Sequence, residues 1–256
     1  MVIKSKHMFS DKSKLIDSSV SFHSTLASGW SKGYSSGGFK RRIEFFRSLL
    51  IKLVRVESRW LDAGCGSGIL AREIGALGAS VIAVDAADEM VDFAINEHLI
   101  SVPVLYKKIT TIEKLDDIDN NFDGVFCSSV IEYVDNPHLA IMEFIRVTKP
   151  GGLLVISVPN KFSIIRFFQK IIKNISNFFG RKKFLYLDFS INEYTYNDLY
   201  NLLEGSGYLV DKIDIFDPIL PNLTNRLYLG SLFVAIAHKP LSVSVLTVDH
   251  LPKTTK

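Results

Sequence analysis

Apolar runs alternate with helical patterns through the middle of the chain. Runs at 60–64, 80–86 and 102–109 are separated by two segments with helical patterns, 69–77 and 88–96. Strands that alternate with helices of this length are typical of βαβ units, because a parallel neighbour is reached only through a crossover connection. The pattern therefore predicts an α/β protein with a parallel sheet.

The same alternation continues to residue 159. A strand pattern at 122–129 and a helix pattern at 137–147 lead into the turn sequence Lys-Pro-Gly-Gly at 149–152 and then into the run 153–159. This run is apolar on both faces, as expected of a central strand with helices on either side. We expect it to lie in the middle of the sheet.

Weaker patterns flank this core. Before it, a Ser/Gly break at 35–38 precedes a helix whose apolar residues recur between Ile43 and Leu53. After it, residues 195–207 predict a helix that starts with a capping box of Thr195 and Asp198. Two strand patterns follow, near 209–216 and 227–238.

Length and cysteine content favour one domain in a reducing compartment. A chain of 256 residues can bury one substantial core and carry an insertion. Cys65 and Cys127 give no disulfide framework, and no Cys/His cluster has zinc spacing. No run of 18 apolar residues occurs, and residues 1–20 lack the apolar core of a secretory signal. We expect a cytoplasmic protein.

Positive charge is concentrated in one segment. The net charge is +3, but residues 161–187 carry seven basic residues and no acid, so the rest of the chain totals −4 (3 − 7). A local patch of this kind does not indicate a nucleic-acid partner.

Residues 161–183 combine this charge with an apolar helical face. An aromatic, isoleucine-rich face backed by Lys and Arg is suited to lying on an anionic membrane. The alternative is a cap helix whose apolar face covers the active site of its own domain. The apolar positions are 164, 165, 168, 171, 172, 175, 178 and 179, and the polar ones are Arg166, Lys170, Lys173 and Asn177.

A glycine turn follows the first strand, which ends in Asp62. Gly64, Gly66 and Gly68 allow the backbone to reverse direction and to approach a ligand closely. Their spacing is G-x-G-x-G, whereas a dinucleotide fingerprint needs G-x-G-x-x-G. A carboxylate two residues before the first glycine would repel a pyrophosphate, but it suits a cationic group such as an ammonium or a sulfonium.

Asp85 lies 23 residues after Asp62, at the end of the second strand pattern. A carboxylate in this place can accept two hydrogen bonds from a ribose diol. The two acids together indicate an adenosine ligand with a cationic tail and no pyrophosphate.

Four motifs in this order resemble those of class I S-adenosylmethionine-dependent methyltransferases. The match covers residues 59–160, and within the superfamily the chain is most similar to the ubiquinone-biosynthesis O-methyltransferases and related small-molecule enzymes. It implies a Rossmann-like fold: a mostly parallel seven-stranded sheet with helices on both faces, an N-terminal helical lead-in and a helical insertion after strand 5. The motifs read LDAGCGSGILAREI, VIAVDAADEMV, FDGVFCSSVIEYVDNP and VTKPGGLLVISVPN.

The resemblance also divides the chain. We expect a loose segment at 1–20, a single methyltransferase domain at 21–240 and a tail at 241–256. Within the domain the expected parts are a lid and helix at 21–56, a cofactor-binding core at 57–160, a basic amphipathic insertion at 161–187, and a C-terminal helix with strands at 188–240.

The cofactor that the resemblance implies is S-adenosyl-L-methionine. Gly64, Gly66 and Gly68, with Cys65 between them, would pack against it. Asp62 would lie near its amino group.

Other segments would complete the cofactor site. Asp85 would hold the ribose hydroxyls, and Ser128 would face the methionyl portion. For the adenine, the expectation is apolar contact with Ile112 and Ala86 near Thr111. From the lead-in, Tyr34 and Arg42 would cover the ligand, with Arg42 or Arg41 paired to its carboxylate.

No metal site is expected. In the ubiquinone-type enzymes two glutamates and a histidine after the fourth strand resemble a metal site close to the substrate. At the matching places this chain has Ser129, Glu132 and Tyr133. Only one of the three ligands is kept, which disfavours a divalent metal.

Methyl transfer is an in-line displacement, so the enzyme mainly aligns the nucleophile with the methyl group. A base is needed only where an acceptor hydroxyl must lose its proton. Glu132, Tyr133 and His138 are the candidate catalytic residues, and His23 in the lead-in is another candidate base. The alternative is that Glu132 caps the following helix and Tyr133 packs.

The sequence therefore favours a methyltransferase that acts on an oxygen of a small-molecule or lipid-linked acceptor. In the lipid-linked version the protein is peripheral on the inner face of the membrane. The alternative is a non-catalytic module that binds the cofactor or a membrane. A nicotinamide-dependent oxidoreductase is disfavoured by the glycine spacing and by Asp62.

Overall fold

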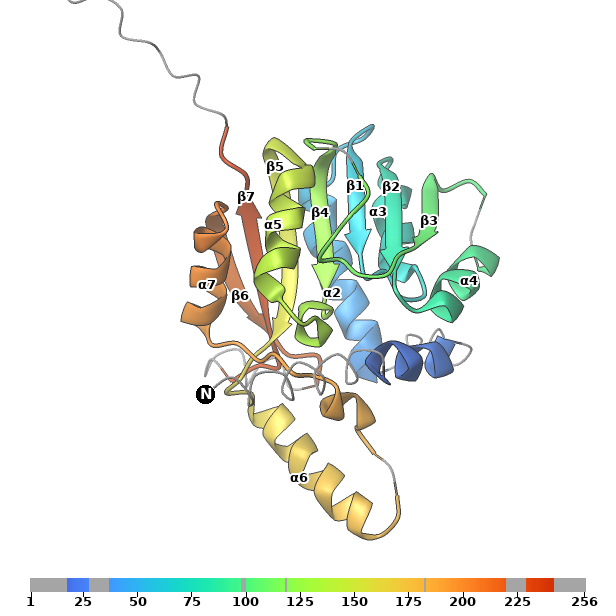
Figure 1. The fold of residues 1–256 in the computed structure, drawn as a ribbon, viewed down its shortest axis with the longest axis vertical. Helices are drawn as coiled ribbons and strands as arrows, with labels where there is room; N and C mark the ends of the chain where they lie inside the picture. Colours follow the sequence, from blue (N-terminus) through green and yellow to red (C-terminus); the bar gives the residue numbers. More distant parts are fainter. Residues whose placement is uncertain are drawn as a thin grey trace, which may run out of the picture.

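A seven-stranded sheet forms the centre of the protein in the computed structural model, which describes residues 18–27, 37–97, 100–117, 119–181, 183–219 and 229–241. The strand order is β3-β2-β1-β4-β5-β7-β6; β7 runs antiparallel to both β5 and β6, and the other described pairs are parallel (Figure 1). The predicted fold class is confirmed. The strands are β1 (Arg59–Ala63), β2 (Ser80–Asp85), β3 (Val104–Lys108), β4 (Phe122–Ser128), β5 (Thr148–Pro159), β6 (Leu209–Phe216) and β7 (Leu232–His238).

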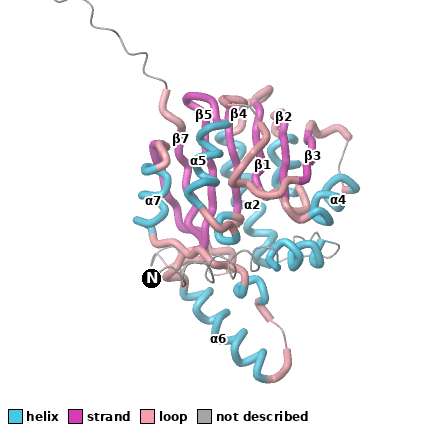
Figure 2. The backbone as a smooth tube through the Cα atoms, in the orientation of Figure 1, coloured by secondary structure: helices cyan, strands magenta, loops and turns pink. Residues whose placement is uncertain are grey.

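Helices cover both faces of this sheet (Figure 2). α5 and α7 pack on one face, while α2, α3 and α4 pack on the other. The helices are α2 (Gly37–Leu53), α3 (Ile69–Ala76), α4 (Asp88–Asn96), α5 (Pro137–Val147), α6 (Ile164–Phe178) and α7 (Tyr196–Gly205), with short 3-10 turns η1 (Ile131–Tyr133) and η2 (Leu185–Asp188).

The run 153–159 lies in the middle of the sheet, as predicted. Leu154 and Ile156 face the core under α5, whereas Val155 belongs to the core on the opposite face. Two faces covered by helices explain why this strand is apolar throughout.

Local sequence signals set the starts of two helices. Oδ1 of Asn136 accepts a hydrogen bond from the N–H of Leu139 at 3.3 Å, and Pro137 supplies a backbone already suited to the first turn of α5. At α7 the side chains of Thr195 and Asp198 each accept from the other's backbone N–H, at 3.2 and 2.9 Å. The predicted capping box is confirmed.

The prediction of a turn at 149–152 was wrong, because these residues are part of β5. The N–H of Gly151 donates to the carbonyl of Lys239, and the N–H of Lys239 donates to the carbonyl of Gly152, so pairing continues through this segment. Gly151 has a φ of +76°, and the register against β4 shifts between Phe122 and Gly124. The Pro-Gly-Gly sequence therefore makes a bulge within a long strand.

Two helices lie beside the carboxyl ends of the parallel strands. The helix of residues 18–27 lies along this edge near α4, and α6 leaves the end of β5 and projects away from the sheet (Figure 1). Residues 18–20, in the segment 1–20 that was expected to be loose, belong to the first of these helices, and residues 1–17 lie outside the described part.

Candidate functional site

The carboxyl ends of β1, β2 and β4 bring the predicted site residues together. In the register of the sheet Asp62 pairs with Ala83 on one side and with Phe126 on the other, two residues before Asp85 and Ser128 respectively. The order of the strands reverses between β1 and β4, and ligands of open α/β sheets bind at such a switch point.

The three glycines of the turn have different roles. All have positive φ, at +79°, +52° and +72°. A Cβ on Gly64 would lie 2.2 Å from Val130, and one on Gly68 would lie 2.6 Å from Tyr106, so these two glycines are required by packing. A Cβ on Gly66 would meet nothing within 4 Å. Gly66 therefore faces the open space of the turn, where a ligand can approach the backbone.

Asp85 is held by the turn that it faces. Its Oδ2 accepts from the N–H of Gly66 at 2.7 Å and its Oδ1 accepts from the N–H of Ala87 at 2.8 Å. A carboxylate has about four acceptor positions, so two remain for a diol. Burial raises the pKa of Asp85, and the two backbone donors and His23 oppose that shift.

Asp62 is a buried carboxyl with an unused oxygen. It is 2% exposed, and its Oδ2 has no hydrogen-bond partner among the described residues. Burial, together with the neighbouring charge of Asp85, raises the pKa of Asp62 to about 8. A cationic ligand group beside Oδ2 would favour the ionised form. The open face of Gly66 and this oxygen both fit the nucleoside and amino ends of S-adenosylmethionine.

Arg42 of α2 reaches the end of β4. Its Nη2 donates to Oγ of Ser128 and to Oγ of Ser129, both at 2.8 Å. Ser128 also shares a hydrogen bond of 2.9 Å with Ser157. The structure thus brings together Arg42 and Ser128, two residues that were each expected to contact the cofactor. Tyr34 lies outside the described residues.

The helix of residues 18–27 contacts both halves of the site. His23 packs edge-on against Tyr133, with ring centroids 4.9 Å apart, and Phe22 packs against Phe189 at 5.0 Å. The charge of His23 also lowers the pKa of Asp85. The helix therefore lies near Asp85 on the expected cofactor side and near Tyr133 of η1 on the other side.

Glu132 is buried in η1 beside the end of β4. It is 2% exposed, and its Oε2 has no hydrogen-bond partner among the described residues. Burial raises the pKa of Glu132 to about 7, opposed by the guanidinium groups of Arg166 and Arg42. The alternative reading, in which Glu132 caps the next helix, was wrong, because Asn136 occupies that position. Burial also raises the pKa of Tyr133.

Other predicted residues lie further from this group. His138 is exposed at the start of α5, beside a hollow that Asn192 and Tyr194 also line. Ile112 is 5% exposed and packs into the core under α5, which leaves little of its side chain for an adenine. The hydroxyl of Thr111 donates to Glu113 at 3.0 Å.

Two more of the predicted cofactor residues, one in the glycine turn and one after β2, are half-buried. Cys65 and Ala86 are neither fully buried nor exposed. Burial holds the pKa of the Cys65 thiol well above its usual range, so this cysteine is a packing residue of the turn.

α6 is oriented with its polar side toward the domain. Arg166 is buried and pairs with Glu193, Lys170 pairs with Glu193 at 2.8 Å, and Lys173 pairs with Asp188. The aromatic and isoleucine side chains point to solvent instead. The exposed ones are Phe162, Ile164, Phe167, Phe168, Ile171, Ile172, Ile175, Phe178 and Phe179. A cap helix that buries its apolar face on its own domain is therefore wrong.

Arg166, Glu193 and Tyr194 were not among the predicted site residues. Arg166 had been read only as part of a basic patch, since helical periodicity separates two faces without saying which one is buried. No sequence signal marked the segment after η2, whose backbone N–H groups at Ile191 and Asn192 donate to the carbonyl of Glu132 at 2.9 and 3.2 Å.

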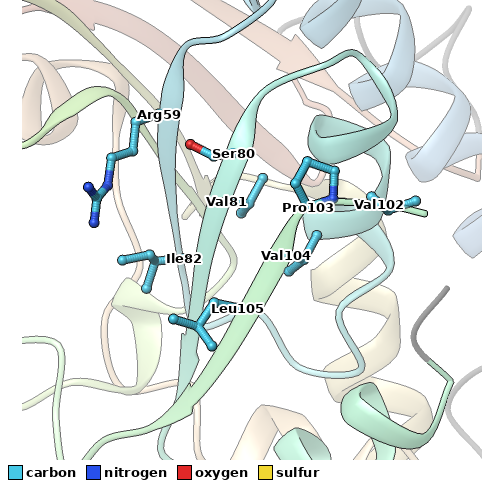
Figure 3. Close-up of a pocket in the computed structure, with 8 residues that line it drawn as sticks. All are labelled: Arg59, Ser80, Val81, Ile82, Val102, Pro103, Val104 and Leu105. Atoms are coloured by element: carbon cyan, nitrogen blue, oxygen red, sulfur yellow. The ribbon is translucent and has the colours of Figure 1, made fainter. Parts of the chain in front are cut away.

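A second hollow lies at the other end of the strands. It has a volume of about 410 Å³ and is lined by Arg59, Ser80 and Leu105 among others (Figure 3). Arg59 and Ser80 begin β1 and β2, whereas Asp62 and Asp85 lie near the ends of the same strands. This hollow is not part of the site.

In the part of the chain that the structure describes, no group of three or more His, Cys, Asp or Glu side chains is placed to hold a metal ion. Of the helices described here, none is long and apolar enough to cross a membrane.

Known proteins are similar to the middle of the chain. Residues 61–156 match the family described as a methyltransferase domain. The chain is 40% identical over 106 residues to the mitochondrial ubiquinone biosynthesis O-methyltransferase of Rattus norvegicus. The aligned residues cover 40% of this chain and 30% of the relative. It is 37% identical over 102 residues to the ubiquinone biosynthesis O-methyltransferase of Colwellia psychrerythraea, covering 40% of this chain and 42% of the relative. The chain thus spans less than half the length of these curated relatives.

Solved structures show the same fold. A methyltransferase from Haloferax volcanii, solved with a methyltransferase activator, has a TM-score of 0.64 at 17% identity and covers 85% of this chain and 97% of its own. A SAM-dependent methyltransferase from Thermotoga maritima has a TM-score of 0.59 at 19% identity, covering 84% of this chain and 97% of its own.

Proposed function

Because residues 61–156 carry a methyltransferase domain, we propose that this protein binds S-adenosylmethionine and transfers its methyl group to an oxygen of a small-molecule or lipid-linked acceptor. The observation that carries this proposal is the arrangement at the ends of β1 and β2. The open backbone at Gly66 is bound to Asp85, and Asp62 at the end of β1 has a buried carboxyl oxygen with no partner among the described residues. This set matches an adenosine ligand with a cationic tail.

The bound cofactor supplies a methyl group that its sulfonium makes transferable. The residues of the chain would hold the cofactor. Asp85 would accept hydrogen bonds from the ribose hydroxyls, and Asp62 would attract the ammonium. Arg42 of α2, whose guanidinium reaches the end of β4, would pair with the carboxylate. Asp62 is buried, and Asp85 and Arg42 are held by hydrogen bonds, so the position of the ligand is well defined, which is what an in-line transfer requires.

Glu132 is the group that can take the acceptor's proton. A base is most effective when its pKa lies near the working pH, and the pKa of Glu132 is about 7. Its Oε2 lacks a partner among the described residues, so it is free to accept a proton from an acceptor hydroxyl. Tyr133 forms the aromatic wall beside it, against His23.

Equilibrium titration tests the cofactor assignment. We expect the full chain to bind S-adenosylhomocysteine with a dissociation constant on the order of micromolar, which corresponds to roughly 8 kcal/mol, and not to retain NAD. Binding of NAD alone would favour the oxidoreductase alternative. Cofactor binding without methyl transfer to any oxygen acceptor in a broad screen would favour the non-catalytic module.

We also propose that α6 rests on a membrane surface on the cytoplasmic side, where a lipid-linked acceptor would be reached. Its exposed side chains form an aromatic and isoleucine-rich face, and such faces on soluble proteins mark contacts with membranes or partners. The helix projects from the same edge of the sheet as the site (Figure 1). Its inner cations are engaged with acids, which leaves Lys161, Arg181 and Lys183 exposed for anionic headgroups.

Liposome flotation tests this second part. We expect the protein to float with vesicles that contain anionic lipid at low salt. A protein that stays at the bottom of the gradient under these conditions would argue against membrane contact and would restrict the acceptor to soluble molecules.

A further inference from the structure

We propose that Arg166 of α6 is a positioning residue that keeps Glu132 ionised and so makes the acceptor-side base depend on the insertion. This inference rests on the proposed function, because it gives Glu132 the role of proton acceptor. It assigns a role to a residue that lies in a different element from every predicted site residue.

The geometry around Arg166 is that of a fixed, buried cation. Its side chain is 8% exposed, and its guanidinium lies 5.9 Å from the ring centre of Tyr186. Nη2 donates to Oγ of Ser190 at 2.9 Å, and Nε donates to Oε1 of Glu193 at 3.3 Å. A guanidinium with this many directional contacts cannot rotate away without breaking several of them.

The same segment holds Glu132. The carbonyl of Glu132 accepts from the N–H groups of Ile191 and Asn192, and the amide of Asn192 donates to the carbonyls of Ile131 and Val134 at 3.1 and 2.9 Å. Residues 190–193 therefore bind α6 on one side and η1 on the other. Any shift of Arg166 relative to this segment changes its position relative to Glu132.

Charge explains why this arrangement matters. A buried carboxyl without a nearby cation takes up a proton and can no longer act as a base at neutral pH. The positive charge of Arg166 is the strongest of the effects that oppose the burial of Glu132, and Arg42 is a weaker one. The titratable groups that face Glu132 are Arg166 from α6, Arg42 from α2, Cys127 from β4, Tyr133 from η1, and Tyr186, Glu193 and Tyr194 from the segment after α6.

Glu193 works in the opposite sense. It neutralises Arg166 through their ion pair, and its own charge raises the pKa of Glu132. Loss of Arg166 would leave Glu132 and Glu193 near each other, with Lys170 paired to Glu193 and only the weaker effect of Arg42 acting on Glu132. Loss of Glu193 would leave the charge of Arg166 more available to Glu132.

The test is a direct titration of Glu132 in the full-length protein labelled with ¹³C at the glutamate carboxyl carbons, with Glu132→Gln used to assign the signal. In Arg166→Gln we expect the midpoint to rise by about one pH unit or more, and in Arg166→Lys, which keeps the charge but not all of the guanidinium contacts, to rise by less. Lys170→Gln is the matched control, since Lys170 is exposed and, in the described part of the chain, its ammonium pairs with Glu193 alone. Its effect should be small.

Glu193→Gln provides a second, independent arm. It should lower the midpoint, because it removes a negative charge and frees Arg166. An unchanged midpoint in Arg166→Gln would overturn the inference. If Arg166→Gln does not fold, an unchanged midpoint in Glu193→Gln would overturn it. A change in Lys170→Gln as large as in Arg166→Gln would also overturn it.

Cofactor binding separates this inference from the proposed function. Arg166 does not touch the glycine turn or Asp85, so Arg166→Gln should bind S-adenosylhomocysteine like the wild type. If the wild type does not bind that ligand, the proposed function fails, whereas the titration of Glu132 still decides whether Arg166 controls its ionisation.

Discussion

The backbone N–H of Gly66 lies 2.7 Å from Oδ2 of Asp85, so the turn after β1 is tied directly to the end of β2. One carboxylate thereby orders the turn and keeps acceptor positions for the ribose hydroxyls of the proposed ligand. Because both tasks fall on the same side chain, a change at Asp85 acts on binding twice.

Asp85→Ala should weaken binding of S-adenosylhomocysteine by tenfold or more, about 1.4 kcal/mol. It removes the acceptor of the ribose hydroxyls and releases the N–H of Gly66. Isothermal titration measures the effect, with Asp85→Asn as the conservative control that keeps one acceptor oxygen and should lose less. Equal affinities in the wild type and in Asp85→Ala would place the ribose elsewhere.

Gly66→Ala should mainly lose cofactor affinity, whereas Gly64→Ala should lose more stability. Alanine at either position adopts a positive φ, at a cost of roughly 1–2 kcal/mol. Only at Gly64 would the new methyl group also collide, with Val130 at 2.2 Å. We expect Gly66→Ala to fold and to lose cofactor affinity, and Gly64→Ala to lower the melting temperature more. Thermal unfolding with a parallel ligand titration checks this; undiminished affinity in a folded Gly66→Ala would show that no ligand approaches this backbone.

Asp62 should make stability fall as pH rises. Its pKa is raised from 3.8 to about 8, mainly by burial, so the folded state holds this proton more tightly than the unfolded chain. The stabilisation is present in full below about pH 4 and is lost as pH rises toward 8. Glu132, raised from 4.5 to about 7, acts in the same direction. The difference in free energy of unfolding between Asp62→Asn and the wild type should therefore shift in favour of the variant as pH increases across this window.

Urea denaturation at several pH values measures that difference. Asp198→Asn is the contrasting control, because hydrogen bonding to the backbone and side chain of Thr195 lowers the pKa of Asp198. The stability that Asp198 contributes is present above its unfolded pKa and lost as pH falls below it, the opposite sign. A pH-independent difference between Asp62→Asn and the wild type would mean that Asp62 is ionised throughout.

Charged substitutions on the outer face of α6 should abolish flotation. Phe178 is 85% exposed, and burying one such side chain in lipid is worth about 2 kcal/mol, or roughly thirtyfold in partitioning. We expect Phe178→Asp and Phe167→Asp each to release the protein from vesicles. Ile100→Asp is the control, since Ile100 is 98% exposed in the loop before β3. If all three variants float equally well, the apolar face of α6 is not the surface that binds the vesicles.

Much of the fold follows from local signals in the sequence. α4, α5 and β6 have the predicted bounds, because their periodicity and caps are encoded within each element. Asp62 and Asp85 were singled out from the glycine turn and the strand that follows it, and Ser128 from the family motifs; the parallel register places all three at one edge of the sheet. The Pro-Gly-Gly segment was misjudged, since its pairing depends on a strand more than 80 residues further along the chain.

The site around Glu132 was only half visible in the sequence. The position of Glu132 came from a motif, but its partners depend on tertiary contacts. Arg166 looked like one of seven surface cations until the orientation of α6 placed it inside. The pattern of α6 gives two faces, and only the acids at Asp188 and Glu193 decide which of them turns inward.

The seam between β1 and β4 carries a consequence for how the protein folds. Trp60 sits there, buried against Gly124, with about sixty residues of chain between the two strands. Closing such a long loop is slow, whereas the neighbouring strands β6 and β7 meet over a much shorter stretch. The candidate site lies across the junction of β1 and β4. It therefore exists only in molecules whose sheet is complete, and the ligand will stabilise finished molecules without accelerating their assembly.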